Sequence, residues 1–438
     1  MELQLQKKKE IQNIKPKNLY QYLFIKALKN MTNGILYIFL NEQEYIKIGK
    51  ENYKIPAYIY VKNEYFFKHC ILFGGIGFAE AFILGYFETP DLYRLLEWFV
   101  DNSENNPGSS YSRTKQFFIN ILGFYNKIIH LFRPNTIKIA KENISKHYDL
   151  SNELYKLMLD STMTYSSAVF SPNINNLTDA QIEKYERICI KLNLKPGLRV
   201  LEIGSGWGGF AKYIAENYDC KVDTITISKE QYEYTKNLIN QYQLNNKINV
   251  HFLDYRQLST SVFGKYDRIV SIEMAEALGH KYLDVYFKKI AEMLKDDGIV
   301  VLQYINFPES HYKNYLKSVD FIKKHIFPGG ELLSHLEVLK SLHKVSELCI
   351  YDLESFGISY AKTLKQWKDN FINNIDKIKQ LNFDDYFIRK WIYYLTYCEV
   401  GFRSRYINVS QVVLSKARNI NIIDSTEFKI NKNYEKNY

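Results

Sequence analysis

Cysteine is scarce in this 438-residue chain, and the spacing of the five that occur excludes two kinds of site. They lie far apart and form no Cys-x-x-Cys pair, so we expect neither a disulfide framework nor a cysteine-based zinc site. The nine histidines also lack the spacing of metal ligands, and we expect no metal. This cysteine usage is typical of a reducing cytoplasm. The five cysteines are Cys70, Cys189, Cys220, Cys349 and Cys398.

The sequence also lacks a signal peptide and a long uninterrupted apolar run. The N-terminus, MELQLQKKKEIQ, carries charges but no apolar core. The longest apolar stretch, residues 70–87, is rich in glycine and broken by Glu80, which makes it too short and too interrupted to cross a bilayer. We therefore expect a protein that lies on a membrane and not across one.

The positive charge of the chain, +10 at pH 7, is spread along the sequence and is not accompanied by a nucleic-acid-binding motif. Basic proteins favour anionic partners, so an anionic membrane surface is the expected partner and nucleic acid is not. Aromatic residues are abundant, with 37 Tyr and 27 Phe. Biased nucleotide composition explains much of this abundance, although aromatic faces can also stabilise a cation.

The length of the chain suggests at least two domains. A polar segment with proline, glycine and serines, DNSENNPGSSYSR at residues 101–113, is the clearest linker. A helical, partly basic stretch follows at residues 114–132. We predict a smaller α+β N-terminal domain over residues 1–135, with its linker, and a second domain over residues 136–438.

In the second domain, apolar strands alternate with helical segments. Strands are predicted at residues 199–203, 221–225, 249–253, 266–272 and 299–305, with a helix at 281–294 and a turn at 295–298. The alternation predicts an α/β fold with a doubly wound parallel sheet. Two late β-like runs, residues 349–356 and 411–415, are candidates to complete the sheet. Residues 306–340 form an insertion with an FPGG sequence, which we interpret as a lid.

The segment LEIGSGWGG, residues 201–209, places glycines directly after the first of these strands. Glycine suits a sharp strand-to-helix turn that a ligand approaches closely. The glycines also spell GxGxxG, but a nicotinamide site needs an acidic residue at the end of the second strand, and Asp223 lies inside that strand. Glu202, just before the glycines, is more typical of methyltransferase loops.

Several further segments make the chain recognisable. It resembles the cyclopropane-fatty-acyl-phospholipid synthase family, which includes the mycolic acid cyclopropane synthases. The resemblance covers roughly residues 55–415, including an N-terminal segment similar to that of the longer, phospholipid-acting members. It rests on HYDLSNELYKLMLDSTMTYSSA (147–168), LKPGLRVLEIGSGWGGFA (194–211), TITISKEQ (224–231), DYRQL (254–258), YDRIVSIEMAEALG (266–279), FIKKHIFPGG (321–330), SFGISYAKTL (355–364) and YYLTYCEVGFRSR (393–405).

The resemblance implies a class I methyltransferase fold, Rossmann-like, with S-adenosylmethionine as cofactor. It implies that residues 165–166 close over the cofactor and that the glycine loop cradles its methionine part. Residues 226–231 are expected at the ribose and adenine side, with Tyr255 beside the base. The residues expected to bind the cofactor are Tyr165, Ser166, Glu202, Gly204, Gly206, Trp207, Gly208, Thr226, Ile227, Gln231, Asp254 and Tyr255.

The resemblance also implies that Glu276 and Tyr360 help to hold a bicarbonate ion next to the reacting carbon, with Ile305 in the same pocket. Each of these residues has a plainer interpretation as well. Glu276 could be a helix N-terminal charge, and Tyr360 could be part of the core.

The chain departs from the family at three positions. Ser167 stands where a bicarbonate-binding cysteine is usual, and Gln303 stands where a histidine is usual. Glu399 adds a carboxyl where many relatives have a small residue, although it could simply pair with Arg403 four residues later. These departures, typical of a sub-branch of the family, put the usual bicarbonate arrangement in question and add three residues to the expected catalytic set.

The chemistry implied by the resemblance leaves the product open. Methyl transfer to an alkene leaves a carbocation, and ring closure then needs a base. An anion in an altered bicarbonate site could take the proton, or Glu276 or Glu399 could take it directly. Proton loss elsewhere, after a hydride shift, would give a methylene or methyl branch in place of a cyclopropane.

Two rival functions are considered. A small-molecule methyltransferase would not need the N-terminal domain or the basic charge. A catalytically inactive cofactor-binding protein is suggested by Ser167 and Gln303, but the intact glycine loop argues against it. The preferred hypothesis is a transferase for unsaturated phospholipid acyl chains, with an N-terminal domain that binds the bilayer or mediates dimerisation.

Overall fold

The computed structural model describes residues 16–42, 44–105 and 151–423, which fall into two compact units. The small unit combines the N-terminal segment with two later segments, Ser310–Ile326 and Phe371–Ser404. The large unit contains the described residues of Arg133–Glu309, Phe327–Asn370 and Arg405–Tyr438. The predicted helix at 114–132, most of the predicted linker and the predicted domain boundary at residue 135 lie outside the described residues, so the division into 1–135 and 136–438 stays a prediction.

The large unit is built on a seven-stranded sheet with the order β10-β11-β9-β8-β5-β6-β7. Strands β5 to β9 run parallel to one another, whereas β11 is antiparallel to both β9 and β10. The strands are β5 (Arg199–Ile203), β6 (Lys221–Thr226), β7 (Ile248–Phe252), β8 (Tyr266–Ile272), β9 (Leu294–Asn306), β10 (Leu348–Ser355) and β11 (Asn408–Lys416). The predicted doubly wound sheet is confirmed, and both late β-like runs belong to it.

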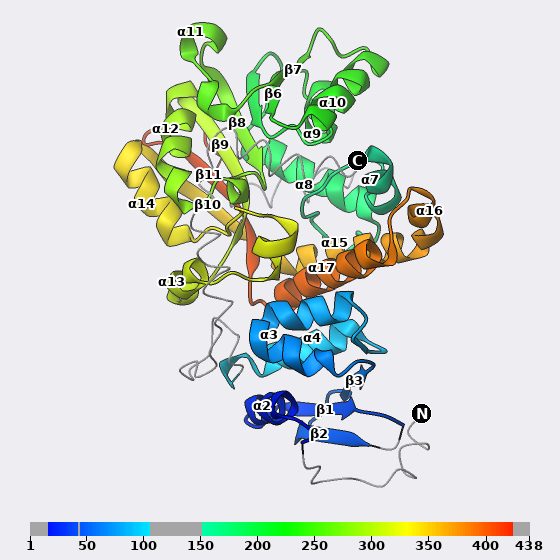
Figure 1. Ribbon diagram of the computed structural model, residues 1–438. Helices are drawn as coiled ribbons and strands as arrows, with labels where there is room; N and C mark the ends of the chain where they lie inside the picture. The colour runs from blue at the N-terminus through cyan, green and yellow to red at the C-terminus, as the bar shows by residue number, and fades with distance from the viewer. Residues whose placement is uncertain (1–15, 43, 106–150, 424–438) are drawn as a thin grey trace. The chain divides into compact units, whose positions relative to one another are not determined.

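Helices cover both faces of this sheet, because its central strands are apolar on both sides (Figure 1). One buried cluster joins the sheet to α12 (Leu283–Met293) and α14 (His335–Val345). The other joins it to α8 (Leu177–Lys191), α9 (Gly209–Asn217) and α10 (Lys229–Gln241). The remaining α-helices of the large unit are α7 (Asn152–Met158), α11 (Thr260–Phe263) and α15 (Gly357–Asn373), whose last residues belong to the small unit.

Residues 295–298, predicted to form a turn before a strand, lie inside strand β9 and interrupt its pairing with β8. Pairing between β8 and β9 skips from Tyr266↔Leu294 to Arg268↔Ile299. The skipped residues include Asp296 and Asp297, which are exposed and cannot pair within a buried sheet. The chain therefore bulges there and β9 begins at Leu294, five residues earlier than predicted.

The small unit contains a four-stranded mixed sheet with the order β2-β1-β3-β4. Its strands are β1 (Gly34–Phe39), β2 (Tyr45–Lys50), β3 (Ala57–Val61) and β4 (Phe87–Glu88), and its helices are α2 (Leu19–Leu28), α3 (Tyr65–Ile83), α4 (Leu92–Asp101), α13 (Glu309–Lys317, from Ser310), α16 (Ile375–Gln380) and α17 (Asp385–Arg403). Helix α17 packs against α3 and α4. The predicted α+β character of the N-terminal region is confirmed, while its partnership with residues 371–404 was not predicted.

Helix α3 is long and apolar enough to cross a membrane, which the sequence analysis did not expect of this region. The helix has 19 residues because it begins at Tyr65, before the apolar stretch that was considered. A kink at Gly74 (φ 59°) interrupts it, and 56% of its apolar window is buried in the structure. The core helix of a compact unit is buried to a similar extent, so the length and apolar character of α3 do not by themselves show that it spans a membrane.

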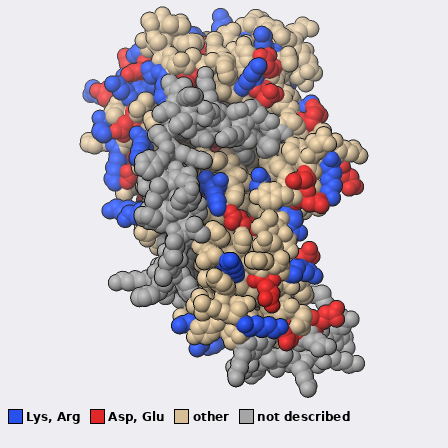
Figure 2. Space-filling view, viewed as in Figure 1, with Lys and Arg blue, Asp and Glu red and all other residues tan. Residues whose placement is uncertain are grey.

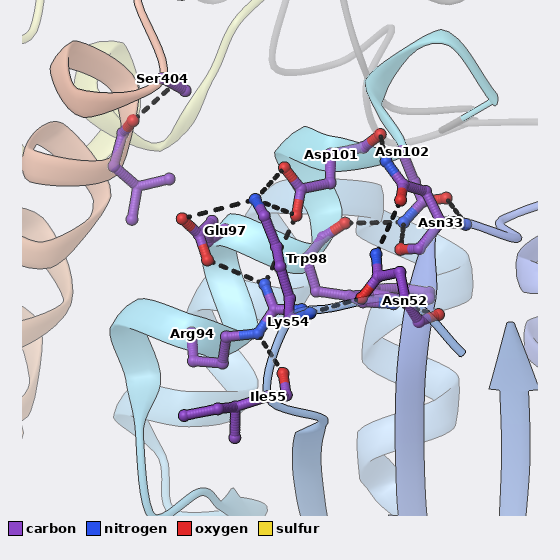
Figure 3. Close-up of polar contacts among 12 residues, drawn as sticks. Asn33, Asn52, Lys54, Ile55, Arg94, Glu97, Trp98, Asp101, Asn102 and Ser404 are labelled. Atoms are coloured by element: carbon purple, nitrogen blue, oxygen red, sulfur yellow. Dashed lines mark hydrogen bonds and ion pairs between the residues drawn. The ribbon is translucent and has the colours of Figure 1, made fainter. Parts of the chain in front are cut away.

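Helix α4 is fastened to the small sheet by a polar cluster (Figure 3). Lys54 Nζ lies 2.9 Å from both carboxylate oxygens of Asp101, and Arg94 Nη1 lies 2.9 Å from Glu97 Oε2. The indole N–H of Trp98 donates to the Gly34 carbonyl at 3.0 Å. The bonds of Lys54 and Trp98 join residues far apart in sequence and hold α4 against the sheet, whereas the Arg94–Glu97 pair lies within α4.

A second polar contact lies inside the small unit, on α3. Glu80 Oε1 accepts from Lys324 Nζ at 2.8 Å and lies 2.9 Å from His325 Nε2. Burial alone would raise the pKa of Glu80, but the hydrogen bonds and charges of His325 and Lys324 lower it to about 2. The ionised carboxylate therefore fastens the segment Ser310–Ile326 to α3.

We predict that Glu80→Gln destabilises the protein by about 2 kcal/mol near neutral pH, because it leaves the partly buried Lys324 ammonium without its anion. A carboxyl whose pKa is lowered by folding contributes stability above its unfolded pKa, and that contribution is lost as the pH falls toward 2. Calorimetric unfolding at pH 7 and at pH 3 measures the effect, which should shrink at the lower pH. Glu88→Gln is the control, since Glu88 is 58% exposed and 4.0 Å from Arg389, and it should change stability little. An equal loss in both variants would contradict the prediction.

Candidate cofactor and catalytic site

The glycine loop follows β5 and turns the chain into α9. Gly204, Gly206 and Gly208 have φ angles of 104°, 48° and 84°, a region that other residues rarely adopt. The amides of Gly204 and Ser205 donate to the Ile225 carbonyl on β6, at 3.1 and 2.9 Å. A side chain at Gly208 would collide with Thr235, whereas one at Gly206 would enter open space. The loop is thus tightly built on one side and open on the other.

The open side faces a cavity of about 170 Å³ at the carboxyl ends of the strands. All the predicted cofactor residues except Gly208 line this cavity. Gly208, with its positive φ angle, forms part of the turn itself. The predicted residues that line the cavity are Tyr165, Ser166, Glu202, Gly204, Gly206, Trp207, Thr226, Ile227, Gln231, Asp254 and Tyr255. The structure therefore brings together a set that the sequence spreads over ninety residues.

Several lining residues are held in place by hydrogen bonds to other side chains. The Thr226 hydroxyl donates to Gln231 Oε1 at 2.9 Å. Asp254 accepts from the guanidinium of Arg256 through both oxygens, at 2.8 and 2.7 Å. Trp207 Nε1 donates to Asn152 Oδ1 at 2.8 Å, which ties the loop to α7. Such bonds fix the shape of the cavity before a ligand enters.

Two buried ionisable groups, one acidic and one basic, lie in the wall. Burial raises the pKa of Glu202 to about 8, against the opposing effects of the Thr224 hydroxyl, which donates to it at 2.5 Å, and of Lys184. Burial lowers the pKa of Lys184 to about 7, against the attraction of nearby carboxylates. Lys184 Nζ donates to Ser166 Oγ at 2.7 Å. The sequence analysis missed Lys184, which lies mid-helix in α8 and has no motif to mark it.

The predicted catalytic residues meet around a carboxylate that was not predicted. Glu273 Oε1 accepts from the Ser167 amide at 2.8 Å and from Gln303 Nε2 at 2.7 Å. Glu273 Oε2 accepts from the Tyr360 hydroxyl at 2.5 Å. Burial raises the pKa of Glu273, while these three donors and Lys184 favour its charged form. Glu273 also lines the cavity, next to the glycine loop.

Glu276 lies three residues further on and has different partners. Its Oε1 accepts from the Ile305 amide at 2.5 Å, so Ile305 contributes its backbone and not its side chain. Its Oε2 has no hydrogen-bond partner among the described residues, and Glu276 does not line the cavity. Burial, reinforced by the charge of Glu273, raises the pKa of Glu276 to about 8.

The sequence contained a signal for Glu273 in the pair of carboxyls of EMAE, which directly follows β8. Only the second carboxyl was selected, because selection followed the family pattern and not the end of the strand. The last predicted residue, Glu399, is buried on α17 in the small unit, and its part in the reaction stays a prediction.

The cavity fits S-adenosylmethionine by its chemistry. The open space at Gly206 leaves room for a ligand against the backbone, and aromatic faces and carboxylates suit a sulfonium cation. The site does not fit the expected bicarbonate ion in the same way. Two of the residues expected to hold it, Gln303 and Tyr360, already donate to Glu273. The backbone amide of Ser167 also donates to Glu273, and the Ser167 hydroxyl donates to the Ala168 carbonyl.

The chain was compared with known proteins. A family model described as mycolic acid cyclopropane synthetase matches residues 136–412. The cyclopropane-fatty-acyl-phospholipid synthase of Escherichia coli (strain K12) is 35% identical over 382 residues, covering 83% of this chain and 89% of that protein. The tuberculostearic acid methyltransferase of Mycobacterium tuberculosis is 32% identical over 352 residues, covering 78% of this chain and 79% of that protein.

Solved structures give a similar result. A mycolic acid cyclopropane synthase in complex with SAH (S-adenosylhomocysteine) and CTAB superposes with a TM-score of 0.58 at 31% identity, covering 63% of this chain and 98% of that one. A coclaurine N-methyltransferase superposes with a TM-score of 0.60 at 18% identity, covering 77% and 98%, which shows a shared fold alone.

We predict that Gly206→Ala raises the dissociation constant for S-adenosylmethionine by about tenfold or more, because the new methyl group occupies the open side of the loop. Isothermal titration calorimetry measures the change. Gly197→Ala is the matched control: Gly197 has φ 83° and open space around it, but lies outside the cavity. Both glycines have positive φ angles, so both variants carry backbone strain, and equal affinities in the two would contradict the prediction.

Proposed function

Because this chain belongs to the mycolic acid cyclopropane synthetase family, we propose that it converts unsaturated phospholipid acyl chains to cyclopropane acyl chains. The family membership predicted from the sequence is confirmed, and the chain is an S-adenosylmethionine-dependent transferase with a class I methyltransferase fold. In the proposed reaction, one carbon passes from S-adenosylmethionine to the double bond.

The observation that supports a phospholipid substrate is the extent of the similarity to the Escherichia coli enzyme. The 382 aligned residues are more than residues 136–438 contain, so the similarity reaches into the N-terminal region. The mycolic acid cyclopropane synthase structure, by contrast, covers 63% of this chain. We propose residues 1–135 as a lipid-binding or dimerisation domain and residues 136–438 as the catalytic domain.

The chain's own residues have three tasks in this reaction. The cofactor, when bound, supplies an electrophilic methyl group. We propose that the lining residues of the cavity hold it, with the glycine loop at the methionine part and residues 226–231 and 254–255 at the ribose and adenine. Aromatic faces such as those of Tyr165 and Trp207 would exclude water and stabilise the cation that forms on the acyl chain.

The remaining tasks are to balance the positive charge and to receive a proton, and we assign both to the carboxyl groups. The proposed catalytic group comprises Glu276, Tyr360, Ser167, Gln303 and Ile305, with Glu399 as a further prediction. In the large unit, Glu276 lies outside the cavity and burial raises its pKa to about 8, so its carboxyl is mostly uncharged near neutral pH and acts through the hydrogen bond that it accepts from the Ile305 amide. Ser167, Gln303 and Tyr360 act through Glu273, to which they donate.

We further propose that the protein works in the cytoplasm at an anionic membrane surface, as a monomer or homodimer. The net charge of +10 supports this partner. On the face shown in Figure 2, basic and acidic residues are interspersed, so attraction to a membrane would depend on net charge more than on one basic patch. Exposed apolar residues of the small unit, including Tyr53 (93%) and Ile55 (75%), are suited to contact with lipid.

A methyl- or methylene-branched product is the second candidate. It is favoured by the similarity to a tuberculostearic acid methyltransferase, which extends over 78% of the chain. Gln303 also replaces the histidine that is usual in the family. Both candidates begin with the same methyl transfer, and a branched product forms when a hydride shifts to the cationic carbon before the proton leaves.

Incubation of the purified protein with S-adenosylmethionine and vesicles of monounsaturated phosphatidylglycerol tests the proposal. We expect mass spectrometry to show a gain of one CH₂ per modified chain, with upfield ring-methylene protons in the NMR spectrum. Vinylidene or methyl-branch signals would support the second candidate. Saturated vesicles are the control, and no gain with unsaturated vesicles would overturn both candidates.

A further inference from the structure

We propose that the carboxylate of Glu273 is the base that takes the proton from the methylated acyl chain, so that the reaction proceeds without bound bicarbonate. This inference rests on the proposed function. It concerns a residue that the sequence analysis did not select, and four features of the structure support it.

The first feature is the convergence of donors on Glu273. They come from three separate parts of the large unit: the segment before α8, strand β9 and helix α15. Together they direct two hydrogen bonds to Oε1 and one to Oε2. A carboxylate oxygen has about two acceptor positions, so Oε2 keeps one for an incoming proton.

The second feature is a chain of hydrogen bonds that orients Gln303. Gln303 Oε1 accepts from Gln411 Nε2 at 3.1 Å, which leaves its Nε2 to face Glu273. Gln411 Oε1 accepts from Lys191 Nζ at 2.9 Å, and Lys191 pairs with Glu354 at 2.8 Å. The buried charge of Lys191 thus fixes the direction of both amides, and Gln303 can only donate to Glu273.

The third feature is backbone strain at Glu273 itself. Its φ angle is 51°, a conformation that is uncommon for glutamate and costs about 1 kcal/mol relative to the usual regions. Its amide donates to the Gln303 carbonyl at 2.7 Å, which holds the strained turn in place. Glycine would adopt this conformation without strain, so the turn itself does not explain a glutamate. Strain of this kind is found where the side chain serves function.

The fourth feature is the position of Glu273 in the cavity wall. It lies in the same wall as Gly204 and Gly206, and it is buried away from bulk water. Loss of hydration strengthens a carboxylate as a base. Lys184, in the same wall, offsets part of its negative charge.

The reaction balances with Glu273 alone. The alkene π electrons form the new bond to the methyl carbon, the carbon–sulfur bond breaks, and its electron pair stays on sulfur to give S-adenosylhomocysteine. A C–H bond of the new methyl group then breaks, and its electron pair closes the ring. The proton passes to Glu273 Oε2, and the resulting carboxylic acid returns it to water after product release.

The same geometry explains why bicarbonate would compete with Glu273. Both present a planar pair of oxygens, and in this structure the donors Gln303, Tyr360 and the Ser167 amide are bound to the Glu273 pair. Ser167, Gln303 and Tyr360 are therefore positioning residues for an internal carboxylate.

The experiment compares the wild type with Glu273→Gln and Glu273→Gly, using S-adenosylmethionine and monounsaturated phosphatidylglycerol vesicles in buffer freed of carbon dioxide. We expect full wild-type activity in this buffer. Glu273→Gln should lower kcat about a thousandfold, because the amide keeps the shape but accepts no proton. Its dissociation constant for S-adenosylmethionine should stay within about twofold, which also reports that the variant is folded.

Glu273→Gly adds a readout that does not depend on activity. Added formate should raise its thermal unfolding midpoint, because the anion refills the space and accepts from the three donors that the substitution leaves without an acceptor. Its activity should be low and should recover in part on addition of bicarbonate or formate, which can enter the vacated space. Gln243→Gly is the matched control: Gln243 has φ 55° and is exposed, so its activity should be unchanged.

The outcomes separate the two proposals. A wild type that modifies no vesicle lipid overturns the proposed function and this inference with it. A wild type that is active only with added bicarbonate, or an active Glu273→Gln, overturns the inference alone. Activity that survives carbon dioxide removal and is lost in Glu273→Gln supports both.

Discussion

The large unit depends on the burial of three carboxylates at one edge of its sheet. Glu202, Glu273 and Glu276 are all removed from water, and their pKa values are raised mainly for that reason. A buried carboxylate is tolerated only with hydrogen bonds or an opposite charge. Thr224, the Ile305 amide and the three donors to Glu273 meet this requirement, and Lys184 supplies the compensating positive charge. These hydrogen bonds link strands β6 and β9 and helix α15 to the three carboxyl groups.

The topology explains why these groups meet. The strand order changes direction between β8 and β5, which are neighbours in the sheet but are separated in the chain by β6 and β7. Loops after adjacent strands at such a point diverge and leave a crevice, where ligands bind in open α/β sheets. The glycine loop follows β5 and Glu273 follows β8, so the cofactor cradle and the carboxylate lie on the two sides of one crevice.

The sequence predicted the local features of this arrangement and missed the long-range ones. Strands β5 and β8 were predicted to the residue, because each is a short apolar run that ends at a distinct turn. The bulge at Asp296 and Asp297 was not, since it depends on pairing with β8. Nor could the sequence place residues 371–404 with the small unit, because that grouping arises from packing between distant helices. Glu273 was missed because the selection followed the family pattern to Glu276, and because its left-handed backbone and its three donors from distant segments are visible only in the structure.

The left-handed conformation at position 273 has an evolutionary consequence. Glutamate and glycine codons can differ by a single base, and the chain path at this position suits glycine. One point mutation could therefore exchange a covalently attached carboxylate for an empty space that a small dissolved anion fills, without moving any strand. Lineages could pass between a self-sufficient active site and one dependent on dissolved carbon dioxide, and the dissolved gas content of a habitat could select between them.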